Sequence, residues 1–166
     1  ENFFDEAPEN LMWNDYYNHA NEPVHHVPYL FNHVGAPWLT QKWTRLICQR
    51  GYKNSVEGLV GNEDVGQMSA WYVLSASGIY QICPGKKRFE ITSPVFDKIE
   101  FKLDEKYASG KIFSIEAHNN SPENVYIQKI LLNGEDYNKP YLSYDQIVAG
   151  GKLELFMGDQ PNHNIE

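Results

Sequence analysis

Residues 61–80 read GNEDVGQMSAWYVLSASGIY, and this stretch marks a change in the periodicity of the chain. It opens with a polar loop framed by Gly61 and Gly66. A helix over about residues 67–77 follows, and Gly78 is a typical residue to end it. Beyond this point apolar residues recur at every second position. The stretch therefore separates a helical half from a strand-rich half, which predicts the α+β class.

The helical half contains two further helix starts. In Asn21-Glu22-Pro23, a capping side chain precedes a proline near the first helical position. Residues 24–33 carry apolar side chains almost all round, so we expect them to form a buried helix. A second start at Gly35-Ala36-Pro37 opens an amphipathic helix, for which Gly51 is the expected end.

The strand-rich half shows a period of two. Three segments alternate apolar and polar residues and a fourth is a further candidate strand: Lys98–Leu103, Phe113–Ala117, Lys152–Met157 and Tyr126–Leu132. Turn residues such as Asn133-Gly134 separate them. We expect an antiparallel β-sheet or sandwich with one wet face over residues 79–166. The helices of residues 1–78 then either belong to a larger helical domain or pack onto this sheet.

The composition excludes several classes of partner. The chain has 166 residues and a net charge of −8, so it lacks the basic surface that nucleic acids and anionic membranes require. No apolar run reaches the roughly 18 residues of a membrane span. Aromatic residues make up 14% of the chain, and those not needed for the core suit stacking against sugars. We expect the two cysteines, Cys48 and Cys83, to be free and buried, with a disulfide as the alternative.

The loop of residues 61–67 holds the densest group of polar side chains. As a simple helix cap, it would use Asp64 as the acceptor for the helix amides. One cap needs only one acceptor, however, and the neighbouring Met68 and Trp71 indicate a buried setting. Carboxylates in such a setting need a partner, a metal or a substrate hydroxyl. The loop is therefore a candidate site for chemistry, with capping as the alternative.

A second polar group lies at residues 18–26. Adjacent histidines on a helix point about 100° apart, and the spacing lacks a zinc signature, so we expect no zinc site. The hard oxygen atoms of Glu22 and Asn21 suit calcium better. His25 and His26 would donate hydrogen bonds to sugar hydroxyls. The alternative is a helix start with one buried and one exposed histidine.

Two stretches of the sequence resemble a known family. Residues 21–32, which read NEPVHHVPYLFN, and residues 61–80 are similar to signature stretches of glycoside hydrolase family 92. Both stretches are long and specific. The similarity continues through Pro84-Gly85 into the less distinctive strand-rich half, so it covers essentially the whole chain.

The resemblance implies an exo-acting α-mannosidase of the α-1,2 type that inverts anomeric configuration, requires calcium and degrades mannose-containing glycans. The family pairs an N-terminal β-sandwich with a helical (α/α)6-type barrel and a closing β region. Residues 1–78 would be the last barrel helices, and residues 79–166 the closing antiparallel β region. The resemblance also implies a secreted, periplasmic or cell-surface location.

The resemblance also implies roles for individual residues. Asp64 matches the catalytic base. The acidic residue that is usual two positions earlier is replaced here by Asn62, which cannot take a proton and would orient water or a hydroxyl group. Asn21 and Glu22 would hold calcium. The residues expected to bind the terminal mannose are Glu63, Gln67, His25 and His26.

One catalytic group is missing. Inverting enzymes need a general acid roughly 6.5–9.5 Å from the base. The family carries it in a Glu-Gly-Asn-type motif, whereas Glu57-Gly58 is followed here by Leu59. We therefore expect a C-terminal fragment that needs the missing N-terminal part of the same enzyme and is inactive alone. The alternatives are a non-catalytic carbohydrate-binding or structural β module, and an interaction domain that binds neither sugar nor calcium.

Overall fold

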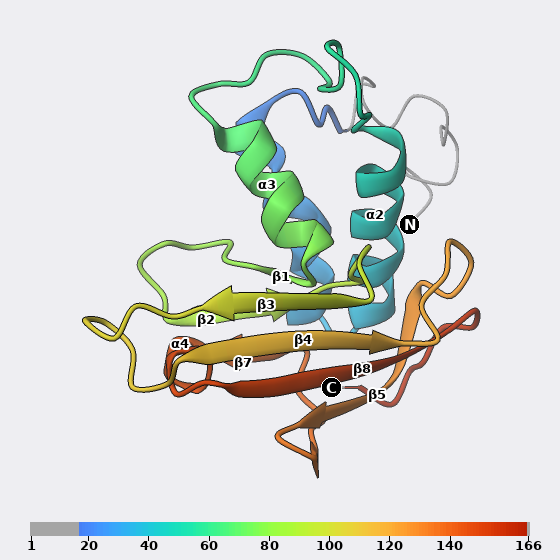
Figure 1. Ribbon diagram of the computed structural model, residues 1–166. Helices are drawn as coiled ribbons and strands as arrows, with labels where there is room; N and C mark the ends of the chain where they lie inside the picture. The colour runs from blue at the N-terminus through green and yellow to red at the C-terminus, as the bar shows by residue number, and fades with distance from the viewer. Residues whose placement is uncertain (1–16, 166) are drawn as a thin grey trace.

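The computed structural model describes residues 17–165, and Figure 1 shows the long helices together on one side of the strands. Residues 1–16, the start of the expected helical part, lie outside the described residues. The helices are, with η for a 3-10 helix, η1 (Glu22–Val24), η2 (Val27–His33), α2 (Pro37–Arg50), α3 (Gln67–Ala76) and α4 (Tyr144–Val148). The strands are β1 (Ile79–Tyr80), β2 (Arg88–Ile91), β3 (Lys98–Lys102), β4 (Ile112–His118), β5 (Tyr126–Leu132), β6 (Glu135–Asp136), β7 (Tyr141–Ser143) and β8 (Gly151–Gly158). The expected α+β class is confirmed.

The segment expected as one buried helix forms two 3-10 helices, η1 and η2. Each begins beside a proline, Pro23 in η1 and Pro28 in η2. Pro28 has no amide hydrogen and disfavours the α conformation in the preceding residue. This explains why the chain does not continue as one α-helix through His25 and His26.

The two long α-helices form where the sequence predicts them. α2 has Pro37 in its first turn, and Gly78 follows α3 closely with a left-handed φ of +95°. Trp43 of α2 and Trp71 of α3 are buried in an aromatic core of the helical half. α3 is apolar on its outer side as well, where Val73 is 56% exposed.

The strands form two sheets, in the orders β1-β2-β7 and β3-β4-β8-β5-β6. The four predicted strands correspond to β3, β4, β5 and β8. Inward residues such as Phe113 and Leu153 are completely buried in a second core. The sequence analysis does not predict β1, β2, β6, β7 or α4, because elements of two to five residues are too short to show a period.

One strand pairing corrects the expected antiparallel arrangement. β4 and β8 are parallel, with Phe113 opposite Gly151 and His118 opposite Phe156. Parallel neighbours need a long connection, and the chain from residue 119 to residue 150 supplies it. Period-two alternation predicts which face a side chain occupies but not the direction of the neighbouring strand.

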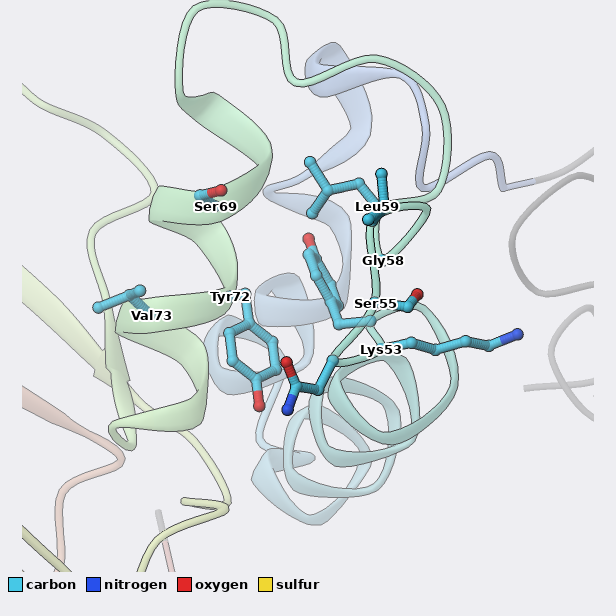
Figure 2. Close-up of a pocket in the computed structure, with 10 residues that line it drawn as sticks. Lys53, Ser55, Gly58, Leu59, Ser69, Tyr72 and Val73 are labelled. Carbon is cyan, nitrogen blue, oxygen red and sulfur yellow. The ribbon is translucent and has the colours of Figure 1, made fainter.

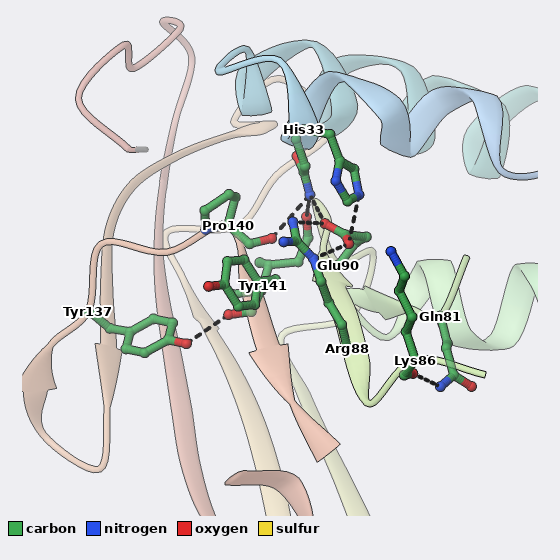
Figure 3. A network of polar contacts seen from close by, with 10 residues as sticks. His33, Gln81, Lys86, Arg88, Glu90, Tyr137, Pro140 and Tyr141 are labelled. Carbon is green, nitrogen blue, oxygen red and sulfur yellow. Dashed lines mark hydrogen bonds and ion pairs between the residues drawn. The ribbon is translucent and has the colours of Figure 1, made fainter. Parts of the chain in front are cut away.

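A buried carboxylate joins the helical half to the strands (Figure 3). Glu90 of β2 is fully buried and accepts from Arg88 Nε at 2.6 Å and from Asn32 Nδ2 at 3.1 Å. His33 Nε2 lies 3.1 Å from the same carboxylate. The guanidinium of Arg88 also stacks 3.8 Å from the ring centre of Tyr141. Because Asn32 and His33 belong to η2, the network fixes η2 against β2.

Arg45 holds α2 to the loops of the strand-rich half. Its almost completely buried guanidinium donates to Ser93 Oγ at 3.2 Å and to Asn120 Oδ1 at 2.5 Å. It also donates to the carbonyl oxygens of Pro94 and Ser121. The two halves are therefore joined by directional polar contacts as well as by apolar packing.

Both cysteines are free thiols, as expected. Cys48 is buried, but Cys83 is exposed, which corrects the expectation that both are buried. Cys83 lies in the turn between β1 and β2, outside both cores. Among the described helices, none combines the length and apolarity needed to cross a membrane.

Candidate active site

Two polar segments that lie far apart in the sequence meet in the helical half. We name them the first segment, residues 18–26, and the acidic loop, residues 61–67. Gly61 has φ +80°, and a Cβ atom on it would lie 2.7 Å from the Cβ atom of Ala20. A larger residue at position 61 would push the acidic loop away from the first segment. The meeting of the two segments therefore depends on glycine at this position.

The acidic loop has a strained backbone. Asp64, Val65 and Gly66 follow one another with φ values of 51°, 60° and 91°. A left-handed φ is costly for a β-branched residue such as Val65. Such strain persists only where the surrounding structure imposes it, and it is often found at functional sites.

Glu63 anchors the acidic loop to α3. Its carboxylate accepts hydrogen bonds from the Ser69 amide at 3.1 Å and from the Ser69 hydroxyl at 2.8 Å. Its backbone carbonyl accepts from the Met68 amide at 3.2 Å. Glu63 thus does the capping that the simple interpretation of the loop assigned to Asp64. The carboxyl group of Asp64 is left free for a different contact.

That contact is with Glu22 of the first segment. The carboxyl groups of Asp64 and Glu22 lie within reach of each other, so that a hydrogen bond forms between them when one of the two is protonated. This interaction raises the pKa of Asp64 and lowers the pKa of Glu22. The charge that His25 carries when protonated acts in the opposite direction on Asp64.

His25 is buried, with 2% of its surface exposed. Its Nε2 lies 2.9 Å from the carbonyl oxygen of His19, and its Nδ1 lies 3.1 Å from Nε2 of Gln67. Gln67 Nε2 also donates to Tyr80 Oη at 3.2 Å. Burial lowers the pKa of His25 below its usual 6.5, so the ring is neutral at pH 7.

The predicted site residues fall into three groups. One group forms a single contact network: Glu22, His25, Asp64 and Gln67. Three others are exposed in the same two segments and make no side-chain hydrogen bond to any residue from 17 to 165: Asn21, Asn62 and His26. Glu63 is turned toward α3. His25 is buried and His26 is exposed, which agrees with the alternative interpretation of this histidine pair.

Aromatic residues that the sequence analysis does not assign to the site hold this network in place. Trp71 Nε1 donates to the carbonyl oxygen of His25 at 3.1 Å. The His19 ring stacks on His25 with centroids 4.6 Å apart and contacts the hydroxyls of Tyr17 and Tyr52 at 2.8 Å and 2.7 Å. The abundance of aromatic residues is the only signal in the sequence, and it does not tell which of them converge.

A cavity lies beside the site rather than in it (Figure 2). Its volume is about 510 Å³, and it lies between residues 52–59 and the side of α3 that carries Ser69, Tyr72 and Val73. None of the residues in the contact network lines it.

The donor atoms of the site suit a hard cation. Glu22, Asn21 and Asp64 offer carboxylate and carboxamide oxygens, which Ca²⁺ prefers. Among residues 17–165, no lysine or arginine perturbs the pKa of Glu22 or Asp64. Two carboxylates close together without a basic partner repel each other, and a bound cation would offset that repulsion. The residues present therefore fit calcium.

A further group of potential ligands lies on the five-stranded sheet. Ligand atoms of Glu116, His118 and Glu154 lie within 4.8 Å of one another. Lys152 Nζ is 3.4 Å from Glu116 and 3.1 Å from Glu154, and Lys98 Nζ is 3.3 Å from Glu116. Because these carboxylates already have cationic partners, we interpret the group as an ion-pair network on the surface.

The family model described as the glycosyl hydrolase family 92 catalytic domain matches residues 1–159. An uncharacterized secreted glycosidase of Arthroderma benhamiae is 29% identical over 143 residues, which cover 85% of this chain and 18% of that protein.

Solved structures of family 92 enzymes from Bacteroides thetaiotaomicron are also similar. An α-mannosidase in complex with mannoimidazole is 41% identical, with a TM-score of 0.83 over 89% of this chain and 19% of its own. An inverting mannosidase is 40% identical, with a TM-score of 0.82 over 90% of this chain and 20% of its own. The chain thus spans about a fifth of the length of these relatives.

Proposed function

Because the chain belongs to glycosyl hydrolase family 92, we propose that it forms the C-terminal part of a calcium-dependent, inverting exo-α-mannosidase of the α-1,2 type. Residues 1–78 are then the last helices of an (α/α)6-type barrel, and residues 79–166 are its closing β region. The two separate cores, one in each half, support this division. The description of two structural relatives as mannosidases, one of them inverting, supports the activity.

The contact between Glu22 and Asp64 carries the proposal. It joins the two stretches that resemble the family signatures, and it involves two acidic side chains without a basic partner in the described residues. In the proposed reaction, the Asp64 carboxylate accepts a proton from a water molecule as its oxygen attacks the anomeric carbon. The bond to the leaving oxygen breaks on the opposite face of the sugar, so the configuration inverts.

In this proposal the general acid that protonates the leaving oxygen lies outside these 166 residues. Acid and base of an inverting enzyme stand roughly 6.5–9.5 Å apart, on opposite sides of the scissile bond. The remainder of the protein must therefore place its acid across the sugar from Asp64. The chain alone should not turn over substrate, in keeping with the fifth of its relatives' length that it spans.

Calcium would be held by the Glu22 carboxylate, which lies close to Asp64, and by the carboxamide oxygen of the preceding residue, Asn21. When bound, it would polarise sugar hydroxyls and favour a distorted ring close to the transition state. Asn62, two residues before the base, orients the attacking water or a hydroxyl group.

The terminal mannose of a glycan is the proposed substrate. Gln67 and His26 contact its hydroxyls, whereas the buried His25, with both ring nitrogens already bonded, holds Gln67 in place. Glu63 holds the acidic loop on α3. We also propose that the protein acts as a secreted, periplasmic or cell-surface enzyme. A relative described as a secreted glycosidase supports this location.

The test is α-mannosidase activity of the full-length protein that contains this chain. It is measured with calcium, with a chelator, and as Asp64→Ala. We expect activity to be lost in both perturbed cases while the circular dichroism spectrum stays unchanged. Asp159→Ala, at an exposed aspartate beyond β8, is the control and should retain activity. Full activity of Asp64→Ala would refute the assignment of the base.

A further inference from the structure

A chain of hydrogen bonds leads from the helical core to Gln67. The donor and the acceptor of each bond can be assigned, because the chain begins at the carbonyl oxygen of Met68, which can only accept. Tyr52 Oη lies 3.1 Å from the carbonyl oxygen of Met68 and 2.7 Å from His19 Nε2. The single hydroxyl hydrogen of Tyr52 goes to the carbonyl, so His19 Nε2 carries the hydrogen of the other bond. His19 Nδ1 then accepts from the Tyr17 hydroxyl at 2.8 Å.

The side chain of His19 is therefore anchored at both ring nitrogens. It is completely buried, and the Trp71 ring packs edge-on against it with centroids 4.4 Å apart. Burial, and secondarily the charge of His25, lower the pKa of His19 to about 3, so the ring is neutral. These contacts restrain the ring and, through the short link to the main chain, the backbone carbonyl of His19.

That carbonyl determines the tautomer of His25. The carbonyl oxygen only accepts, so His25 Nε2, at 2.9 Å, carries the ring hydrogen and Nδ1 carries a lone pair. The His19 ring stacks on His25 with centroids 4.6 Å apart, which restricts rotation of the second ring. His25 thus presents an acceptor to Gln67.

The tautomer of His25 in turn fixes the amide of Gln67. One amide hydrogen goes to His25 Nδ1 at 3.1 Å, and the other goes to Tyr80 Oη at 3.2 Å. A flipped amide would place its oxygen against the lone pair of Nδ1. Both hydrogens are therefore used, and Gln67 Oε1 accepts from no residue between 17 and 165.

We infer that His19 is a positioning residue that, through His25, orients the Gln67 carboxamide so that Oε1 accepts a hydrogen bond from one hydroxyl group of the bound sugar. The inference rests on the proposed function, because it assigns to Gln67 a specificity role in that site. A site built around one acceptor rejects an analogue that lacks the matching hydroxyl. His19 contributes to this selectivity without touching the sugar.

A double-mutant cycle on the full-length protein tests the inference. Gln67→Met keeps the length of the side chain and removes the amide, and His19→Phe keeps the stacked ring and removes both nitrogens. Each single change should lower kcat/KM for an aryl α-mannoside about tenfold, the value of one lost hydrogen bond. The double variant should be no worse than Gln67→Met alone, because His19 acts through Gln67.

Monodeoxy mannosides separate positioning from a general loss of structure. The wild-type protein should discriminate against one of them, and both single variants should lose this discrimination. A merely structural role of His19 would lower kcat/KM equally for every substrate. His118→Phe is the matched control: its ring stacks on Phe156 at 4.6 Å on the five-stranded sheet, and its kcat/KM should be unchanged.

Two results would overturn the inference while leaving the mannosidase activity established. One is a double variant in which the two losses of kcat/KM multiply, and the other is a His19→Phe variant that still discriminates between the monodeoxy mannosides. A wild-type protein that hydrolyses no mannoside would instead refute the proposed function. If His19→Phe does not fold, Tyr52→Phe replaces it in the cycle, because it removes the oxygen that accepts from His19 Nε2 and otherwise gives up only the hydrogen bond to the Met68 carbonyl.

Discussion

Glu22, the first residue of η1, and Asp64 lie within hydrogen-bonding reach of each other, although η2 and α2 separate them in the sequence. Two carboxylates this close repel each other when both are ionised, and a bound cation would relieve the repulsion. The same pair offers an oxygen-rich site for calcium and a carboxylate for general-base catalysis.

Calcium should therefore stabilise the full-length protein through Glu22. A ligand present at 100 times its Kd adds about 2.7 kcal/mol to the free energy of unfolding. We expect calorimetry to show a higher Tm with calcium than with a chelator, and this difference should vanish in Glu22→Gln. Glu100→Gln removes an exposed carboxylate on β3 and should keep the difference. An equal response of Glu22→Gln and wild type would place the cation elsewhere.

Gly61→Ala should separate the two segments of the site. The new Cβ atom would lie 2.7 Å from the Cβ atom of Ala20, and φ at this position is +80°. We expect the free energy of unfolding to fall by about 2 kcal/mol or more and kcat/KM to fall with it. Both are measured on the full-length protein, by denaturant unfolding and by steady-state kinetics.

The matched control for this change is Gly134→Ala in the turn between β5 and β6. Its φ is +84°, but a Cβ atom there meets nothing within 4 Å. Gly134→Ala should lower the free energy of unfolding by only about 1 kcal/mol, because alanine is disfavoured at a left-handed φ, and it should leave kcat/KM unchanged. Equal losses of activity in the two variants would show that the contact with Ala20 does not position the site.

Glu90→Gln should weaken the junction between η2 and β2. The change removes the negative charge that faces Arg88 and His33, and Arg88 is itself only partly exposed. We expect the free energy of unfolding to fall by about 2 kcal/mol, with solvent access to Arg88 limiting the loss. Denaturant unfolding measures it, and a change within about 0.5 kcal/mol would contradict a structural role for this ion pair.

The two cysteines should differ in reactivity. Burial raises the pKa of the Cys48 thiol to about 12, so it stays protonated and unreactive at pH 8, whereas Cys83 is exposed. Iodoacetamide should label one thiol in the native chain and both after denaturation, as mass spectrometry will show. Since the unfolded thiol ionises near pH 9, stability should decrease as pH rises from about 9 toward 12. Rapid native labelling of Cys48 would contradict its burial.

The sequence predicts the long elements of the fold but not their pairing. The helices α2 and α3 and the strands β3, β4, β5 and β8 each extend over enough residues to show a period. The parallel pairing of β4 and β8 depends on the path of the chain between them, which no periodicity records. The prolines predict helix starts, but not that Pro28 limits the segment to 3-10 geometry.

The candidate site shows the same division between local pattern and tertiary contact. Glycines and acids in residues 61–67 predict a functional loop, yet the capping role goes to Glu63 rather than Asp64 because Ser69 lies within its reach. The contact of His19 with Tyr52 is tertiary, and neither it nor the local contact with Tyr17 leaves a motif in the sequence. Which of many aromatic residues converge on a site is decided only by packing.

The most direct test of the central claim replaces the proposed base and supplies another nucleophile. In full-length Asp64→Ala, hydrolysis of an α-mannoside with a good leaving group should fall to a small fraction of the wild-type rate. Added azide, which needs no base to attack the anomeric carbon, should restore turnover and give the β-configured mannosyl azide, identified by its NMR spectrum. Undiminished hydrolysis without azide, or an α-configured azide product, would contradict the account of Asp64 as the base of an inverting mannosidase.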